Sequence, residues 1–193
     1  MDIELFKQLL LREPPKFMVQ RYLFDEFPYA FKDNQQNYYD LREKICGTFD
    51  IHPNNFTIVG SAKLGFSLNP DTLWRPFTDG SDIDIVLVSD KLFQDVWMQL
   101  LLYGQNTLIL STEEKRRFKE LQKILYFGKI RPDKMPPKFP FSKKWWSFFN
   151  NLSRQQLRTI RAALFKSWQH VSFYYEYNFA SVKERLQNES NGN

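Results

Sequence analysis

Two aspartates one residue apart, Asp82 and Asp84, stand at the start of the apolar run 83–88. Because alternate side chains of a strand point to the same face, the two carboxylates are predicted to converge. Two like charges held that close need a compensating cation, and oxygen ligands alone suit Mg²⁺ or Mn²⁺ better than zinc. The pair therefore predicts a divalent metal site.

A Gly-Ser pair, Gly60 and Ser61, follows the apolar run 56–59, which is predicted to be a strand. A turn there offers backbone N–H groups and one hydroxyl to a phosphate. A helix is expected to begin just after the turn, and the aspartates then open the next strand. Lys63, just beyond the turn, is either a further phosphate contact or a solvent-exposed lysine.

This arrangement resembles the DNA polymerase β-like nucleotidyltransferase superfamily, whose signature is a Gly-Ser turn followed by Asp-x-Asp on the next strand. The matching residues are Gly60, Ser61, Asp82 and Asp84, and the resemblance covers residues 56–90. It implies an α+β nucleotidyltransferase fold, a small mixed sheet flanked by helices. It also implies that the aspartates hold the metals and the turn holds a nucleoside triphosphate. The implied reaction transfers a nucleoside monophosphate to a hydroxyl of RNA, protein or a nucleotide.

The sequence departs from that pattern in two places. The loop 68–80, which contains two prolines, is longer than in simple family members and is either a lid or a surface insertion. The family's third carboxylate is not obvious. Its best candidate is Asp133, at the end of the β-favourable run 124–133, although an aspartate there also suits a plain turn. Asp95 and Glu176 are weaker candidates, since both are expected in helices. Without a third acid, the chain would be an inactive nucleotide-sensing or scaffold module.

Compact stand-alone members of this superfamily in bacteria include antibiotic-modifying enzymes, nucleotidylating toxins and nucleotide-signal synthases tied to phage defence. The resemblance therefore favours a toxin or a defence enzyme.

The composition favours one compact domain over residues 1–193. The chain is 42% hydrophobic and 17% aromatic, more aromatic than a minimal core needs, so some rings are expected to face a ligand or a partner. Cys46 is the only cysteine, which excludes an intramolecular disulfide and favours the reducing cytoplasm. His52 and His170 have no partners at zinc-ligand spacing. No signal peptide and no membrane span is expected.

The charge is unevenly distributed along the chain. Residues 113–166 hold fifteen Lys or Arg against four Asp or Glu, whereas the whole chain carries +5. Such a basic face suits a triphosphate, an RNA backbone or an acidic protein. Trp145 and Trp146, close to Lys143 and Lys144, fit either single-stranded nucleic acid or a core that closes over a loop.

Three regions are expected along the chain. Residues 1–50 are predicted to be helical, 56–135 to form the core that carries the motifs, and 153–187 to form one long helix that Ser153 caps. Apolar residues recur there at steps of three and four from Leu157. That helix is expected either to pack along the domain or to extend outward to a second copy or another partner.

Overall fold

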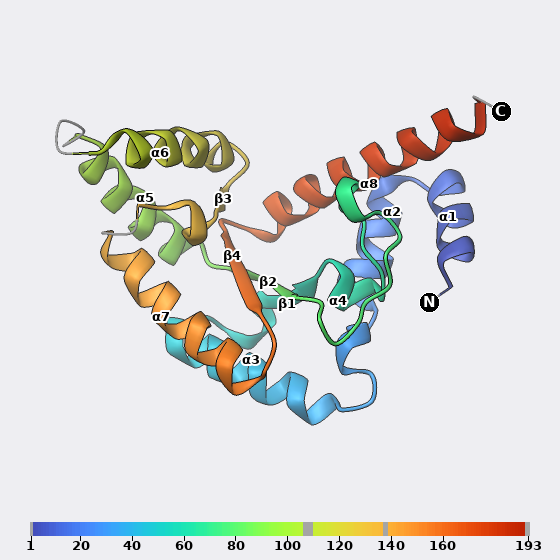
Figure 1. Ribbon diagram of the computed structural model, residues 1–193, viewed down its shortest axis with the longest axis horizontal. Helices are drawn as coiled ribbons and strands as arrows, with labels where there is room; N and C mark the ends of the chain where they lie inside the picture. The colour runs from blue at the N-terminus through green and yellow to red at the C-terminus, as the bar shows by residue number, and fades with distance from the viewer. Residues whose placement is uncertain (1, 106–109, 137–138, 192–193) are drawn as a thin grey trace.

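The computed structural model describes residues 2–105, 110–136 and 139–191, and it has an α+β architecture (Figure 1). Within these ranges the strands are β1 (Phe56–Val59), β2 (Ile83–Val88), β3 (Lys129–Ile130) and β4 (Ile160–Phe165). They form one mixed sheet in the order β1-β2-β4-β3. The predicted small mixed sheet flanked by helices is therefore confirmed.

The sheet brings distant parts of the chain together. β1 pairs antiparallel with β2, so that Val59 lies opposite Asp84. β2 pairs in parallel with β4, so that Asp84 lies beside Arg161. β3 completes the sheet by pairing antiparallel with β4. The end of β1 and the beginnings of β2 and β4 thus meet at one edge of the sheet.

Eight α-helices surround the sheet in the part of the chain that is described. Their bounds are α1 Ile3–Arg12, α2 Pro15–Val19, α3 Gln35–Phe49, α4 Ser61–Leu64, α5 Asp90–Gln105, α6 Thr112–Leu125, α7 Pro140–Gln155 and α8 Trp168–Asn191. Shorter helical segments are η1 (Gln20–Asp25), η2 (Tyr29–Phe31), η3 (Pro53–Asn55), η4 (Pro70–Thr72) and η6 (Pro132–Lys134). The Asp2 side chain accepts a hydrogen bond from the Leu5 N–H and so caps α1.

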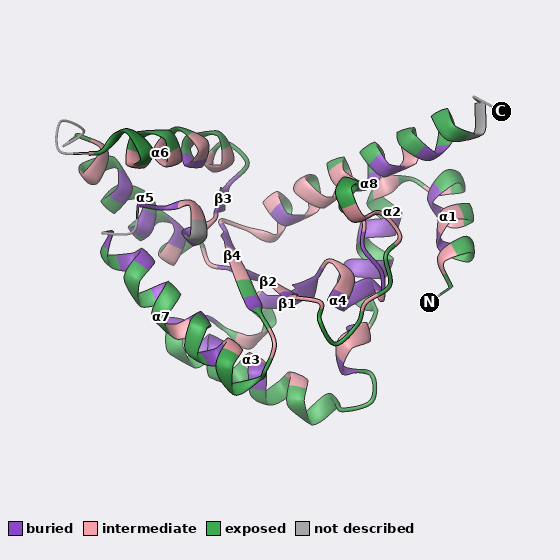
Figure 2. Ribbon diagram, in the orientation of Figure 1, coloured by how far each residue is buried: buried purple, intermediate pink, exposed green. Residues whose placement is uncertain are grey.

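The two faces of the sheet pack against different helices. Ile58 and Ile85 on one face belong to the large core shared with α3, α5, α6 and α7. Val59 and Val86 on the other face lie beneath η1 and α8. Figure 2 shows the buried strands between these layers, with exposed outer surfaces on the helices. Since Asp84 alternates with its neighbours in β2, it lies on the face that α8 covers.

A long C-terminal helix is confirmed, but its predicted span over residues 153–187 is wrong. Residues 140–155 form α7, residues 160–165 form β4, and only residues from 168 onward form α8. The apolar steps of three and four continued through residues 160–165 by coincidence, because β4 is apolar and its backbone pairs with β2. Ser153 caps no helix: its hydroxyl donates to the Phe149 carbonyl and accepts from the Ile160 N–H.

The aromatic pair of the basic region is divided between core and surface. Trp145 is buried against Phe49 and Phe149, which supports its interpretation as core. Trp146 is partly exposed and donates from its ring to the Pro132 carbonyl. Cys46 is buried, and burial raises the pKa of its thiol to about 11. Among the helices of the described residues, none is both long enough and apolar enough to cross a membrane.

Candidate functional site

The Gly-Ser turn and the second aspartate are in direct contact. Gly60 has φ 66° and ψ −150°, a conformation that only glycine adopts readily. A Cβ placed on Gly60 would lie 3.2 Å from Oδ2 of Asp84. The lack of a side chain at Gly60 therefore lets the carboxylate approach the backbone of the turn. Ser61 begins α4 directly after it, as the sequence predicts.

The two aspartates form a coupled pair. Burial raises the pKa of the Asp84 carboxyl, and the negative charge of Asp82 raises it further. Asp82 is more open to solvent, and its Oδ2 lies 3.3 Å from a guanidinium nitrogen of Arg161. The carboxylates of Asp82 and Asp84 are thus close enough for the charge of one to affect the pKa of the other.

Arg161 is the site residue that sequence reasoning missed. It lies beside Asp84 in the register of β4 and is more than half exposed. Its positive charge lowers the pKa of Asp84, against the effect of burial. The sequence contains a weak signal, because Arg161 interrupts an otherwise apolar run, but the apolar steps of three and four through that run predict a helix. On this neighbouring strand an arginine occupies the position nearest to the aspartate pair.

Two further cations from the β3 segment act on Asp84. Lys129 and Arg131 both lower the pKa of its carboxyl, to a smaller extent than Arg161. The Lys129 ammonium also lies 3.7 Å from the ring centre of Tyr174 in α8. Burial is the largest single influence on Tyr174 and raises the pKa of its phenol, but the charge of Lys129, hydrogen bonds to Lys129 and Asn178, and the charge of Arg131 together lower it. Three cations, Arg161, Arg131 and Lys129, thus partly offset the negative charge of the carboxylate pair.

Lys63 points away from the carboxylates. It is buried, and its ammonium donates to the Glu26 carbonyl in the segment that follows η1. Burial lowers its pKa to about 8. In this arrangement Lys63 fastens α4 to the N-terminal region, and the predicted phosphate contact would require that bond to break.

The three candidates for a third acid lie in different places. Asp133 is in η6, which follows β3, and β3 runs antiparallel to β4 toward the end that holds Arg161. The side chain of Asp133 lies outside the described part of the structure. Asp95 is exposed on α5, which starts beyond the opposite end of β2. Glu176 lies in α8, as its expected helical state required.

The donor set fits a hard divalent cation that also has phosphate ligands. Among the described residues, no three Asp, Glu, His or Cys side chains cluster as a complete metal site. Mg²⁺ commonly takes only one or two protein carboxylates and completes its shell with substrate phosphates and water. Asp82 and Asp84 match that pattern, and their like charges favour a bound cation.

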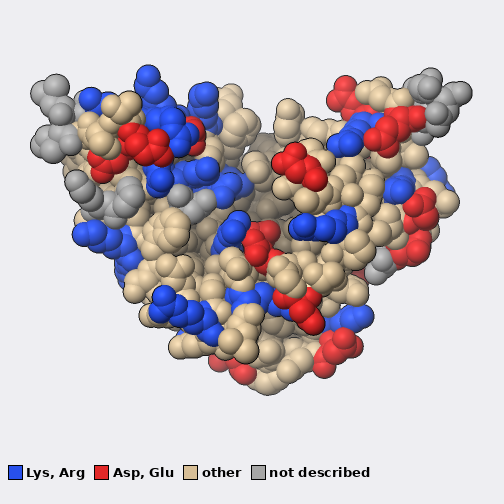
Figure 3. Space-filling model, in the orientation of Figure 1, with Lys and Arg blue, Asp and Glu red and all other residues tan. Residues whose placement is uncertain are grey.

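Figure 3 shows the charged side chains on one face of the molecule. Acidic and basic side chains lie side by side near its middle, below a hollow between the two upper parts of the molecule. Part of the predicted basic face is neutralised within α6, where Glu113 bonds both Arg116 and Arg117 at 2.8–2.9 Å. These arginines therefore behave as a solvated helix surface.

Comparison with protein-family models, with curated proteins and with solved structures found no match to this chain.

Proposed function

We propose that this chain is a metal-dependent nucleotidyltransferase that transfers a nucleoside monophosphate from a nucleoside triphosphate to a hydroxyl acceptor. The observation that supports it most directly is the contact between Gly60 and Asp84. The contact places a turn of the kind that binds phosphate beside a carboxylate pair of the kind that binds a cation. The two features therefore belong to one site.

Each residue has a defined role in this proposal. Asp82 and Asp84 hold Mg²⁺ or Mn²⁺, which supplies charge neutralisation for the phosphates and the leaving pyrophosphate. The turn at Gly60 and Ser61 binds phosphate oxygens through its N–H groups and hydroxyl. Arg161, on the neighbouring strand, is placed to bind a further phosphate oxygen once it leaves Asp82.

The acceptor hydroxyl needs a group that takes its proton. Asp133 remains the proposed base, because the chain after β3 heads toward the Arg161 end of β4. The basic region 113–166 would hold an RNA or protein acceptor. A role as a toxin or in phage defence rests on the sequence resemblance alone.

Transfer of radiolabel tests the proposal. The protein is incubated with each α-³²P-labelled nucleoside triphosphate, Mg²⁺ or Mn²⁺, and total RNA or lysate. We expect label in a macromolecule or a new small product, lost in the Asp82→Ala/Asp84→Ala double variant. Asp40→Ala, an exposed carboxylate on α3, is the matched control and should keep full transfer. Transfer that persists in the double variant would exclude this site.

A nucleotide-sensing module without turnover is the second candidate, and Arg161 favours it. Arg161 lies beside Asp84 on β4 and partly neutralises the charge of the aspartate pair. A third carboxylate at that position would instead add a ligand to the metal site. Metal-dependent triphosphate binding by calorimetry, with no transfer to any acceptor, would support sensing. Loss of binding in the double variant would place that binding at the same aspartates.

A further inference from the structure

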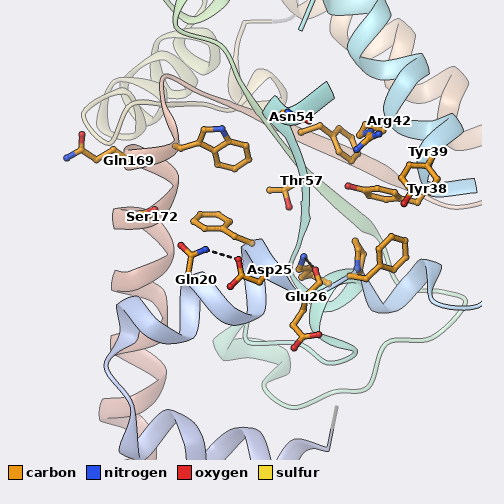
Figure 4. Close-up of a pocket in the computed structure, with 16 residues that line it drawn as sticks. Gln20, Asp25, Glu26, Tyr38, Tyr39, Arg42, Asn54, Thr57, Gln169 and Ser172 are labelled. Carbon is orange, nitrogen blue, oxygen red and sulfur yellow. Dashed lines mark hydrogen bonds between the residues drawn. The ribbon is translucent and has the colours of Figure 1, made fainter. Parts of the chain in front are cut away.

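A second cavity lies beyond the outer edge of β1, away from the aspartates. Its volume is about 670 Å³, within the usual range of small-molecule sites. No strand among the described residues pairs with this side of β1. Figure 4 shows β1 in the middle, with Ser172 and Gln169 of α8 on one side and Tyr38, Tyr39 and Arg42 of α3 on the other.

Aromatic rings form both walls of this cavity. On the α8 side, Trp168 meets Phe24 edge-to-face, with 5.4 Å between ring centres. On the α3 side, Tyr38 packs in the same way against Phe27 at 5.1 Å and Phe56 at 5.9 Å. Rings fixed by such contacts present flat apolar surfaces on which another planar ring can stack.

Arg42 brings a positive charge to the cavity and also hydrogen-bonds the Tyr38 side chain. Its guanidinium lies over the rings of Tyr39 and Tyr38, at 5.1 and 5.6 Å from their centres. Its Nε is buried and has no hydrogen-bond partner in the described structure. No carboxylate among the described residues pairs with it. The guanidinium as a whole lines the cavity, where an anionic ligand can pair with it.

The acidic groups near the cavity are already engaged. Asp25 accepts a hydrogen bond from the Gln20 amide at 2.8 Å. Glu26 lies 3.3 Å from Arg21 in an ion pair. Lys63, the other cation of the lining, donates to the Glu26 carbonyl, so Arg42 is the cation that is left to pair with a bound anion.

The cavity is separate from the aspartate pair. Gly60, Asp82 and Asp84 do not line it. Val59 and Val86 lie between them in a buried cluster, over which Tyr175 and the Phe24–Trp168 pair are packed. A ligand in the cavity would thus leave the proposed metal site free.

We propose that this cavity binds a nucleoside monophosphate at a second site, independent of the metal. The aromatic walls would stack the base, the Asn54 amide and Thr57 hydroxyl would bind its polar edge, and Arg42 would pair with the phosphate. Planar rings, one amide and one guanidinium are the groups that such a ligand requires. The proposal does not depend on catalysis at the aspartates.

Calorimetric titration with AMP and GMP, in EDTA, tests this site while the proposed metal site cannot contribute. We expect the wild type and the Asp82→Ala/Asp84→Ala variant to bind equally. Arg42→Gln should weaken binding by about tenfold or more, as the loss of a charge-assisted hydrogen bond implies. Lys44→Gln removes one charge from the exposed side of the same helix and should have no effect.

Ser172→Trp provides a second test that leaves the guanidinium intact. Ser172 lines the cavity from α8, so a tryptophan there should fill the space and abolish binding without unfolding the protein. Adenosine and ribose 5-phosphate should each bind more weakly than AMP, because each lacks one half of the recognised chemistry. The proposal is overturned if the wild type binds neither nucleotide, if Ser172→Trp binds as the wild type does, or if the double aspartate variant loses binding.

Discussion

Asp84 and Arg161 occupy the same register position on the parallel strands β2 and β4. The two side chains carry opposite charges, and a guanidinium nitrogen of Arg161 also lies 3.3 Å from Oδ2 of Asp82. The carboxylate pair is thus partly neutralised by its own fold before any metal or nucleotide binds. This relationship determines how the site should respond to substitution.

Asp84→Asn should stabilise the protein in the absence of metal while it abolishes binding of Mn²⁺. Burial and the charge of Asp82 raise the pKa of Asp84, so the folded wild type binds more protons than the unfolded chain above the ordinary pKa of aspartate. Stability should therefore fall as the pH rises through the raised pKa, and the variant should lack that fall. Thermal melts should show a gain of about 2–4 °C for each kcal/mol.

The exposed Asp40→Asn serves as the control for Asp84→Asn and should change neither property. A lower melting temperature for Asp84→Asn without metal would mean that Asp84 is a structural group.

Arg161→Gln should increase the affinity for Mn²⁺ in the absence of nucleotide. The arginine competes with the cation for Asp82, and both side chains are partly exposed. Its loss should therefore change stability by only about 0–1 kcal/mol. Mn²⁺ titration followed by electron paramagnetic resonance measures the affinity. Arg154→Gln, an exposed arginine at the end of α7, is the control. Weaker binding in Arg161→Gln would show that Arg161 orients Asp82 for the metal.

Gly60→Ala should destabilise the fold by about 1–3 kcal/mol, because its backbone conformation is strained for any residue with a Cβ. The new Cβ would also press on Oδ2 of Asp84 at 3.2 Å. Gly47→Ala, in the last turn of α3 with open space around it, should instead stabilise by about 0.5–1 kcal/mol. Urea denaturation of both variants gives the comparison, and equal effects would contradict the role of Gly60.

Lys63→Met should remove a pH dependence of stability. The folded pKa of Lys63 is about 8, below its ordinary value of 10.5, so the unfolded chain binds more protons between these values. Wild-type stability should therefore rise with pH across that window, by an amount on the order of 2–3 kcal/mol. Denaturation at pH 7.5 and 10 should show a smaller rise in Lys63→Met. The exposed Lys16→Met should match the wild type; an unchanged rise in Lys63→Met would assign it to other groups.

Short-range patterns in the sequence predicted the part of the site formed by the Gly60 turn and the two aspartates. The apolar runs 56–59 and 83–88 do form neighbouring strands, and a turn at Gly60 lies between them. Such β-branched runs with a glycine turn are local signals. The two strands follow one another in the chain, and consecutive strands commonly lie side by side in a sheet, so the contact of Gly60 with Asp84 was within reach of sequence reasoning.

The position of Arg161 in the site depends on contacts between distant parts of the chain, which local sequence patterns do not predict. The run 160–165 includes Ala162, Ala163 and Leu164, which favour helices. Pairing with β2 overrides that preference and places Arg161 at the site. The break before the strand also has a tertiary cause, because Ser153 joins the end of α7 to the Ile160 N–H. Arg42 was missed for the same reason, since its cavity is formed by α3, η1 and α8 together.

The placement of β4 beside β2 has a consequence for the order of folding. β1 and β2 are close in sequence, whereas α5, α6 and α7 separate β2 from β4. Contacts distant in sequence form slowly, because the intervening chain must first give up its freedom. On the ribosome, β1 and the aspartates are therefore synthesised well before Arg161. During that interval the nascent chain contains the two aspartates without the arginine that later offsets their charge. A divalent cation can then bind them without competition from Arg161.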